Sequence, residues 1–346
     1  MSVSPMPPAR ASRAAVSSPV SSGVSPRAAA SPGGLAFLVL SGLCWGTAGL
    51  LGSLLGRAGG LSPLAVASYR LIVGGVLLIT LLIAARRRWP RGRRAVTRIV
   101  AIGLLSASYQ ACYFVAVSLT SVGLATLVTI GATPVMVMAV ERATGRRRFD
   151  RRAVITIVLA LTGLGLLVGL PPAGLSLPAV LAGAGLALVS ATAFSVITLL
   201  GARRVPDLDD VTMTGLAFAV GGVALVALAA PTVGLGFRPA PDTLLLLIAL
   251  GVVPTALGYL LYFRGLRTAS ASTASVLALL EPLTGMVLAA LLLGQHVNAA
   301  GIVGAVLLAG GVVLAATPRG GRGKASENRV YDARSDVYQQ QICEGD

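Results

Sequence analysis

The stretch ASASTASVLALLEPLTGMVLAALLLGQ, residues 269–295, decides how this chain folds. It is apolar over more than the roughly 20 residues that a helix needs to cross a bilayer. Near its middle stands one carboxylate, Glu281, and Pro282 follows at once. A charge at mid-membrane costs about 2.5–3.5 kcal/mol on insertion scales, so such residues face a bundle interior or a water-filled cavity. Because proline lacks a backbone N–H, we expect the helix to break beside this acid.

Two interpretations of Glu281 stay open. A carboxylate beside a broken helix at the bilayer midplane is typical of a transport site. Intramembrane ionisable groups favour a functional role by default. The structural alternative is a protonated glutamate that is hydrogen-bonded to a neighbouring helix.

The composition excludes a soluble protein. Of 346 residues, 55% are hydrophobic and only 12% are charged, whereas soluble domains carry about 25% charged residues. The net charge of +16 does not indicate a nucleic-acid partner, because the arginines form short clusters between apolar segments. The three cysteines and one histidine show no disulfide or metal-site spacing, so we expect neither a metal nor a cofactor.

Apolar segments recur along the chain, each long enough to span a bilayer as a helix. We expect ten spans, at residues 35–56, 64–84, 97–117, 121–141, 153–170, 176–200, 211–230, 243–263, 269–293 and 298–317. The polar segments 1–33 and 319–346 are expected to be disordered cytoplasmic arms. The first arm has no continuous apolar core, so it does not resemble a secretory signal.

The arginines predict the orientation of the spans. One alternating set of connections carries clusters such as RRRWPRGRR at 86–94 and GRRRFDRR at 145–152, while the other set carries only Arg57 and Arg238. Positive residues in short loops stay on the cytoplasmic side. We therefore expect a multi-pass protein of the cytoplasmic (plasma) membrane with both termini in the cytoplasm. Glu141, at the end of the fourth span, is expected to pair with the neighbouring arginines.

The two halves of the sequence resemble each other. Residues 111–141 and 259–295 each contain an aromatic pair, a short turn of Ser, Thr and Ala, and an apolar helix with a proline, Pro134 or Pro282. This predicts an all-α integral membrane fold of two five-helix repeats, 34–170 and 171–318. Five is an odd number, so the repeats must lie oppositely in the membrane, which is the inverted-repeat plan of many secondary transporters. Pro134, Pro282 and Pro254 in the eighth span are the predicted helix breaks.

These features resemble the drug/metabolite transporter superfamily, and within it the ten-helix EamA-type transporters, over residues 35–317. The residues that carry the resemblance are Trp45-Gly46, Arg70, TS-x-x-x-A-T at 120–126, and Glu281-Pro282 followed by LLLGQ. Two positions depart from the pattern. The family commonly has Gly-Glu where this chain has Gly294-Gln295, and the first repeat has Thr133 where the second has Glu281. The resemblance implies export or exchange of small metabolites or drugs through a cavity between the repeats.

Polar and aromatic side chains inside the spans are the candidates for substrate binding, because small-molecule sites combine apolar walls with a few polar groups. They are Trp45, Arg70, Tyr109, Gln110, Tyr113, Thr129, Tyr262 and Glu281. Each has a structural alternative. Arg70 can snorkel to the outer interface, Tyr113 and Tyr262 can belong to an interfacial aromatic belt, Trp45 can pack between helices, and Thr129 can bond its own helix.

The sequence therefore predicts a secondary transporter that exports small amino-acid-like or amphipathic molecules by alternating access. Glu281 is the proton-coupling candidate, because burial favours the neutral acid and a nearby positive charge favours the carboxylate. The expected partners are a small-molecule substrate, the lipid bilayer and protons, with no nucleic acid; a homodimer stays open.

Alternatives to an exporter remain. An uptake permease or facilitator for a sugar or another small metabolite is the nearest one. An intramembrane enzyme is a distant alternative, because it would need a Ser-His pair, two aspartates or a metal. The single histidine, His296, lies in a loop. A channel would need rings of charge, which one glutamate and one arginine do not supply.

Overall fold

The computed structural model describes residues 31–87, 89–145, 150–169 and 174–317. Within these residues ten helical spans are long and apolar enough to cross a membrane, which confirms the predicted all-helical membrane fold. The expected disordered arms lie outside the described residues, apart from 31–33, where the first helix begins. The elements are α1 Pro32–Gly59, α2 Pro63–Ala84, α3 Arg93–Leu119, α4 Val122–Ala143, α5 Arg151–Val168, α6 Leu177–Gly201, α7 Asp210–Thr232, α8 Pro241–Leu250, η1 Gly251–Leu257, α9 Gly258–Gly265, α10 Ala271–Leu277, α11 Leu280–Leu293 and α12 Ala299–Ala316.

Serine side chains determine where several spans begin. Ser31 and Ser121 each accept a hydrogen bond at 3.1 Å from the backbone N–H three residues later, and Ser62 does so at 3.3 Å. These caps satisfy N–H groups that the first turn of a helix leaves free. Pro32 and Pro63 follow two of the caps, at a position where the missing N–H of proline is not needed. The polar turns between apolar segments therefore define the span boundaries.

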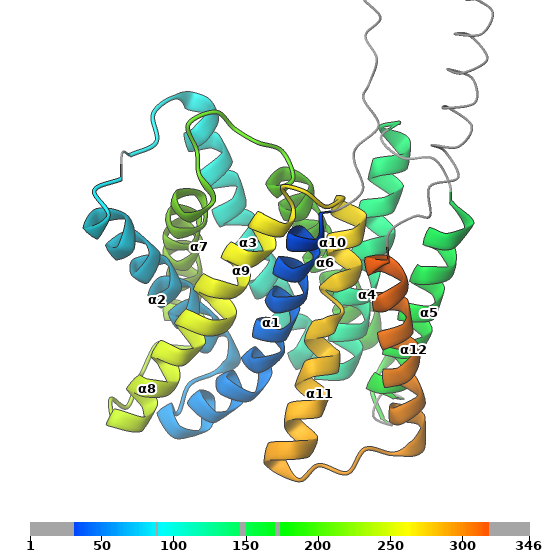
Figure 1. Cartoon of the computed structure of the whole chain (residues 1–346). Coiled ribbons are helices and arrows are strands. Elements are labelled where there is room, and N and C mark those ends of the chain that lie inside the picture. The colour runs from blue at the N-terminus through cyan, green and yellow to red at the C-terminus, as the bar shows by residue number, and fades with distance from the viewer. Residues whose placement is uncertain (1–30, 88, 146–149, 170–173, 318–346) are drawn as a thin grey trace, which may run out of the picture.

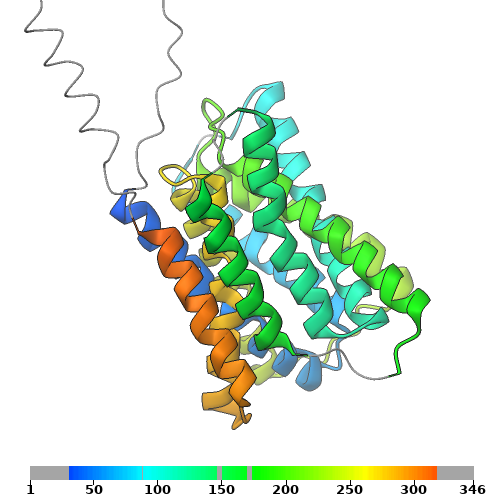
Figure 2. The same ribbon diagram turned by 90° about the vertical axis from the view of Figure 1, so that its right-hand side faces the viewer.

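The two halves of the chain pack into one bundle by exchanging neighbours. α1 packs against α9 and α11 of the second half, and α6 packs against α3 and α4 of the first. α2 packs along α7 at one edge of the bundle and α5 along α12 at the other (Figures 1 and 2). Two copies of one five-helix unit related by a twofold axis would give this exchange, so it supports the predicted repeat. The inverted orientation of the copies stays a prediction.

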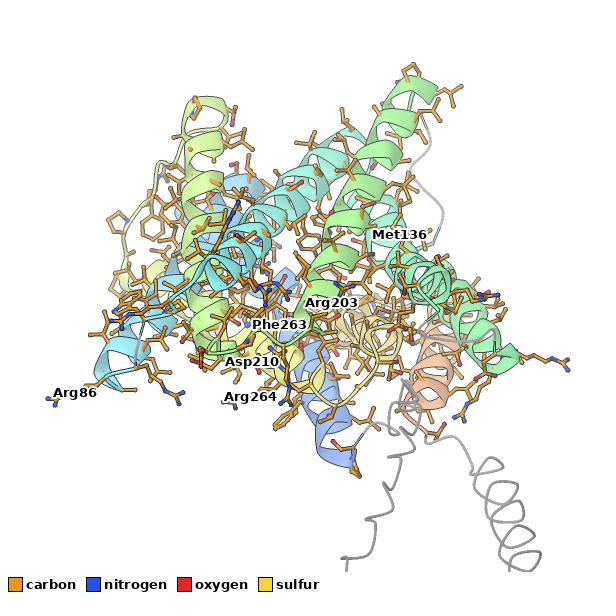
Figure 3. All side chains as sticks on the ribbon, turned by 90° about the horizontal axis from the view of Figure 1, so that it is seen from above. Arg86, Met136, Arg203, Asp210, Phe263 and Arg264 are labelled. Atoms are coloured by element: carbon orange, nitrogen blue, oxygen red, sulfur yellow. The ribbon has the colours of Figure 1, made fainter. Side chains whose placement is uncertain are left out.

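The start of α1 and the end of α12 lie at the same end of the bundle (Figure 1). The connections α2–α3, α4–α5, α6–α7 and α9–α10 lie at this end too, and Figure 3, which looks onto it, labels Arg86, Arg203 and Arg264 there. We call it the arginine-rich end. The arginines thus gather on one side of the bundle, as the expected topology requires. That this side faces the cytoplasm stays a prediction.

Glycines bring α1 into direct contact with the ninth span. A Cβ atom added to Gly46 would lie 2.3 Å from the Cβ of Thr284, and one added to Gly42 would lie 2.6 Å from the Cβ of Leu280. Neither position has room for a larger residue. Gly42-x-x-x-Gly46 thus permits the close helix approach on which packing in lipid depends.

A second glycine pair, Gly183-x-Gly185, behaves differently. Gly183 of α6 faces α3, where an added Cβ would lie 2.4 Å from Cγ2 of Thr120. Gly185 has no neighbouring atom within 4 Å of an added Cβ. Only the first glycine of Gly183-x-Gly185 therefore permits close packing.

The expected helix break at Pro134 does not occur. α4 continues from Val122 to Ala143, with Pro134 buried inside it. In a membrane, a proline is tolerated when neighbouring helices and local hydroxyl groups compensate for the missing hydrogen bond. The Thr133 hydroxyl donates to the Thr129 carbonyl at 2.8 Å in this turn.

Pro254 and Pro282 do lie where helices change. Pro254 belongs to η1, a π-helical segment between α8 and α9, and the Thr255 hydroxyl donates at 2.8 Å to the Leu250 carbonyl. That carbonyl is the one that the missing N–H of Pro254 would otherwise leave free. The ninth span is divided between α10 and α11, and Pro282 lies in the first turn of α11.

Candidate functional site

A cavity of about 550 Å³ lies between the two halves of the bundle, a size typical of small-molecule sites. Its lining comes from α1 to α4 of the first half and from α6, α8, α9 and the ninth span of the second. Arg57 and Val122 line its wide end, and both are exposed at the surface opposite the arginine-rich end. The cavity therefore opens away from the arginine-rich end.

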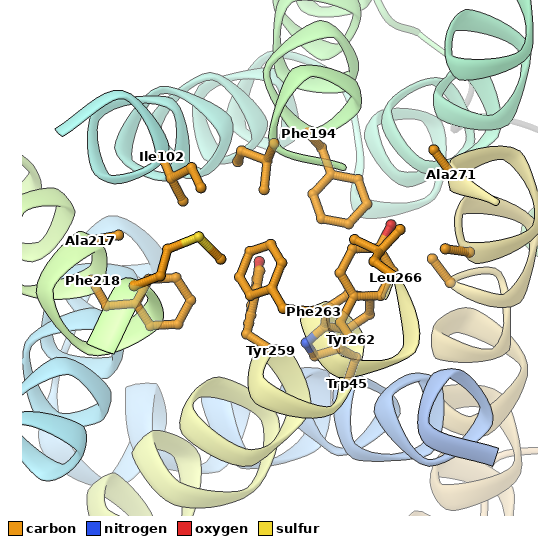
Figure 4. Packing of buried hydrophobic residues seen from close by; sticks show 14 of the residues in the cluster. Trp45, Ile102, Phe194, Ala217, Phe218, Tyr259, Tyr262, Phe263, Leu266 and Ala271 are labelled. Carbon is orange, nitrogen blue, oxygen red and sulfur yellow. The ribbon is translucent and has the colours of Figure 1, made fainter. Parts of the chain in front are cut away.

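Packed aromatic rings lie beside the cavity, and Trp45, Phe194 and Tyr259 among them line it. Figure 4 shows how these rings pack against one another. The Trp45 ring centroid lies 4.9 Å from that of Tyr259, 4.9 Å from that of Tyr262 and 5.8 Å from that of Phe194. Phe263 packs beside Tyr262 at 6.1 Å. Each such pair contributes about 0.5–1.5 kcal/mol beyond the area that it buries. We call these five residues the aromatic layer.

The position of Trp45 follows from its small neighbours. A Cβ added to Gly258 would lie 2.9 Å from Nε1 of Trp45, so the indole lies directly on the α9 backbone. One turn earlier on α1, the Ser41 hydroxyl donates to the Gly258 carbonyl at 2.8 Å. These contacts fix α1 against α9 and hold the indole at the inner end of the cavity.

Glu281 lines the cavity from the first turn of α11. The preceding turn is irregular, and the Glu281 N–H donates at 3.0 Å to the carbonyl of Ala278, one of the two residues between the two helices of this span. A helix N-terminus favours negative charge by about 0.3–1 kcal/mol. The side chain is half-buried because one side of it faces the cavity. The break thus presents one carboxylate to the cavity within an otherwise apolar span.

Arg70 of α2 lines the same cavity and brings a positive charge. No ion pair joins Arg70 and Glu281 in the described part of the chain, where Arg87 pairs with Asp209 and Arg267 with Asp210. The buried Nε atom of Arg70 also has no hydrogen-bond partner there. Both charges are therefore available to a ligand in this state.

Two further polar groups of the cavity lack partners among the described residues. They are Oε1 of Gln110, whose residue is 3% exposed, and Nε1 of Trp45, whose residue is 4% exposed. An unsatisfied buried polar group costs about 1–3 kcal/mol. A ligand that hydrogen-bonds to these atoms would remove that cost. It would need a donor group for Oε1 of Gln110 and an acceptor group for the Nε1–H of Trp45.

The predicted hydroxyl residues also reach the cavity, but their own hydrogen bonds are made. The Tyr113 and Thr126 hydroxyl oxygens lie 2.8 Å apart, and the Thr129 hydroxyl donates to the Ala187 carbonyl at 3.2 Å. Tyr109 lines the cavity with its ring 5.3 Å from that of Phe194. All three side chains shape the wall, and the Tyr113 and Thr129 hydroxyls already have hydrogen-bond partners.

Tyr262 is the predicted site residue that the structure does not bring to the cavity lining. It is 1% exposed, and its hydroxyl lies 2.8 Å from that of Thr198. It lies behind Trp45 in the aromatic layer. Its position supports a packing role, and its proposed contact with substrate has no support from the geometry.

Two parts of the lining were not predicted. Phe194 of α6 contacts Trp45, Tyr109 and Tyr262, but a single phenylalanine within an apolar span carries no signal of its own. The small residues of α1 form one wall, and their spacing of three or four positions was a readable signal. They are Ala48, Gly49, Gly52, Ser53 and Gly56.

Glu141 occupies an unexpected environment at the arginine-rich end of α4. It is 3% exposed, and its Oε2 atom has no hydrogen-bond partner among the described residues. The ion pairs of the described residues do not include it. Residues 146–149 of the neighbouring loop, where its expected partners stand, lie outside the described residues.

The sequence model of the EamA-like transporter family matches residues 32–169 and again residues 181–317. The chain belongs to the EamA-like transporter family. It is thus a member of the drug/metabolite transporter superfamily, as the sequence motifs suggested.

Relatives of this EamA-like protein span almost its whole membrane domain. An uncharacterized transporter of Bacillus subtilis is 26% identical over 290 residues, which cover 82% of this chain and 94% of the relative. An uncharacterized transporter of Clostridium kluyveri is 24% identical, with 81% and 92% covered. One solved crystal structure of a protein superposes with a TM-score of 0.67 at 20% identity, covering 82% of this chain and 96% of its own. That likeness concerns the fold alone.

Family membership decides between the classes of function. The family and the printed names of the relatives are those of transporters, not of enzymes. With its ten apolar spans, the protein is a multi-pass membrane transporter. The substrate, the direction of transport and the coupling ion are matters for proposal.

Proposed function

We propose that this EamA-like transporter exports small amphipathic or amino-acid-like molecules by alternating access, with Glu281 exchanging protons for substrate. The observation that carries the proposal is that Arg70 and Glu281 line one cavity without pairing with each other. Uncompensated charges inside a membrane protein are costly, and they persist where a ligand or an ion uses them.

The lining matches a molecule with three kinds of group. The Arg70 guanidinium can take a carboxylate by charge-assisted hydrogen bonds. Glu281 can take an ammonium group. The rings of Trp45, Tyr109 and Phe194 provide an apolar wall for the body of the ligand. A neutral sugar fits less well, because it would leave both charges uncompensated.

Proton coupling follows from competition at one carboxylate. Glu281 can hold a proton or pair with an ammonium group, but it cannot do both at once. In alternating access, Glu281 is exposed first to one side of the membrane and then to the other. On the side where the substrate leaves, a proton takes its place on Glu281. The account rests on the predicted topology, in which the termini are cytoplasmic and two inverted repeats, 34–170 and 171–318, rock about the cavity.

Thermal shifts of the purified protein test this assignment. The probes share one aromatic ring: phenylalanine carries both charges, phenethylamine only the ammonium, and 3-phenylpropionate only the carboxylate. We expect phenylalanine to stabilise the wild-type protein most, since a ligand that binds the folded state raises its stability by mass action. Arg70→Gln should abolish the response to 3-phenylpropionate, and Glu281→Gln the response to phenethylamine.

A matched control separates the site from general charge effects. Arg57 lies at the exposed mouth of the same cavity, so Arg57→Gln should leave all three responses unchanged. If both charge variants keep the full wild-type responses, the assignment of Arg70 and Glu281 is refuted.

A further inference from the structure

The last turn of α6 is bound by two arginines at the end where the cavity is closed. Arg98 comes from α3 in the first half of the chain, and Arg267 follows α9 in the second half. The exposed backbone carbonyls of a helix C-terminus attract positive charge, so this is a favourable place for guanidinium groups. Both arginines therefore tie neighbouring elements to one helix end.

Arg267 makes the more buried of the two attachments. Its Nε donates to Oδ1 of Asp210 at 2.9 Å, and one NH group donates to the Gly201 carbonyl at 3.1 Å. The side chains of Arg267 and Asp210 are only 14% and 15% exposed. Asp210 is the first residue of α7. One guanidinium thus joins the end of α9, the end of α6 and the start of α7.

Arg98 makes the second attachment from the side of α3. One of its NH groups donates to the Leu200 carbonyl and, at 3.1 Å, to the Arg203 carbonyl. Figure 3 shows Asp210 and Arg203 toward the centre of the arginine-rich end. The two attachments thus lie across the surface through which a substrate would have to pass.

A buried face of α3 leads from the level of these attachments to the cavity. Ile102, Ser106 and Gln110 lie four residues apart on α3, so they share one face of the helix. They are 0%, 1% and 3% exposed in that order, and Gln110 already lines the cavity. This face is therefore packed shut from the level of Arg98 up to the cavity floor.

We propose that Arg98, Arg267 and Asp210 form an inner latch on the end of α6, which holds the arginine-rich end closed while the cavity is open at the opposite end. The latch must release before substrate can pass at the arginine-rich end. This inference rests on the proposed alternating access and adds the contacts that set its resting state. Loss of a latch contact shifts the population toward the state that is open at the arginine-rich end, since it removes an interaction that only the closed state makes.

Paired reporter cysteines test the latch in full-length protein whose native cysteines, Cys44, Cys112 and Cys343, are replaced by serine. Ser53→Cys reports on the open cavity, because Ser53 lines it and is exposed. Ser106→Cys reports on the buried face of α3, because Ser106 is only 1% exposed. N-ethylmaleimide labels each reporter in membranes. We expect Asp210→Asn to raise labelling of Ser106→Cys roughly tenfold and to lower labelling of Ser53→Cys.

The control is the neighbouring ion pair of Arg87 and Asp209. It is long, at 4.0 Å, and exposed, with side chains 57% and 41% accessible. Arg87→Gln should therefore leave both reporters at the wild-type rate. Arg98→Gln repeats the test through the second attachment and replaces Asp210→Asn if that variant does not yield a monodisperse protein.

Two outcomes would overturn the latch. Unchanged labelling of both reporters in Asp210→Asn and Arg98→Gln would show that these contacts do not hold the end closed. Increased labelling of both reporters would show general loosening instead of an exchange of open ends. If the latch alone is wrong, the wild-type protein still transports. If the proposed function is wrong, transport is absent while Asp210→Asn still shifts labelling from Ser53→Cys to Ser106→Cys.

Discussion

At the scale of single residues, the cavity is chemically asymmetric although the repeats align. Thr133 and Glu281 each precede a proline at matching places in the two halves, and both line the cavity. Among the residues that line the cavity, the carboxylate comes from the second half. Away from the exposed mouth, the positive charge comes from Arg70 of the first half. This unpaired acid and base are the basis of our proposal that the cavity binds a ligand with the opposite charges.

The first residue-scale prediction concerns the shape of the Arg70 head group. Arg70→Lys keeps the positive charge but loses the planar fork that binds a carboxylate through two hydrogen bonds. Loss of one such bond costs about 1.5 kcal/mol, so we expect phenylalanine to bind roughly tenfold more weakly by isothermal calorimetry. Arg57→Lys is the control and should bind as the wild type does. Equal affinity of Arg70→Lys and wild type would show that Arg70 does not hold the carboxylate.

A second prediction separates packing from substrate contact. Tyr262 lies behind Trp45, and its hydroxyl pairs with the buried Thr198. Tyr262→Phe leaves the Thr198 hydroxyl without this partner, which should lower the free energy of unfolding by about 1–2 kcal/mol. The thermal midpoint should fall with it. Ligand affinity should stay at the wild-type value. A weaker affinity with an unchanged midpoint would instead return Tyr262 to the substrate site.

At the scale of helices, close packing depends on a few glycines. On α5, a Cβ added to Gly163 would lie 2.4 Å from the backbone nitrogen of Leu308 and 2.6 Å from the Gly304 carbonyl oxygen. These backbone atoms cannot move aside without separating α5 from α12. One turn of α5 thus contains both a position with no free space, Gly163, and one that faces open space, Gly165.

The matched substitutions of these glycines test the packing. Gly163→Ala should destabilise the protein by about 1–3 kcal/mol through overpacking. Gly165→Ala should be neutral or stabilise by about 0.4–1 kcal/mol, because it restricts only the unfolded chain. The measurement is the thermal midpoint in detergent. Equal midpoints for the two variants would contradict the contact between α5 and α12.

The spans were predictable from the sequence, whereas the orientation of their side chains was not. Length and apolarity suffice to predict a span, because an apolar segment in lipid must form a helix to hydrogen-bond its own backbone N–H and C=O groups. The rotation of a helix depends on what packs against it. Phe194 was therefore missed, and Tyr262 was assigned to a cavity that it does not line. Trp45 was found because interfacial tryptophans lie at span ends, whereas Trp45 lies in the middle of its span. Glu281 was found because an acid inside a span is costly unless it faces a cavity or the bundle interior.

Helix breaks show the same limit. Pro254 and Pro282 mark real changes of helix, but Pro134 lies in an unbroken one. The three prolines look alike in sequence. What differs is the helix geometry around them: a regular α-helix at Pro134, a π-helical segment at Pro254 and the first turn of a helix at Pro282. That geometry is set only once the helices have packed.

At the scale of the whole molecule, the described structure is open at one end and closed at the other. The topology determines which of the two ends faces the cytoplasm. Thr144 and Ala299 are exposed at opposite ends of the bundle. In a background without native cysteines, Ala299→Cys should react with an impermeant maleimide from outside intact cells, and Thr144→Cys only after permeabilisation. Reversed labelling would refute the cytoplasmic placement of the arginine-rich end.

The exchange of substrate for protons at Glu281 is tested most directly by recording both fluxes in the same proteoliposomes, with a pH-sensitive dye inside and labelled phenylalanine as substrate. For the wild type we predict that phenylalanine leaving the vesicles brings protons in, so that the lumen acidifies as the label is lost. Glu281→Gln should show no lumenal pH change on addition or loss of phenylalanine, while it still reconstitutes to the wild-type level. Proton movement in Glu281→Gln that matches the wild type would contradict the account.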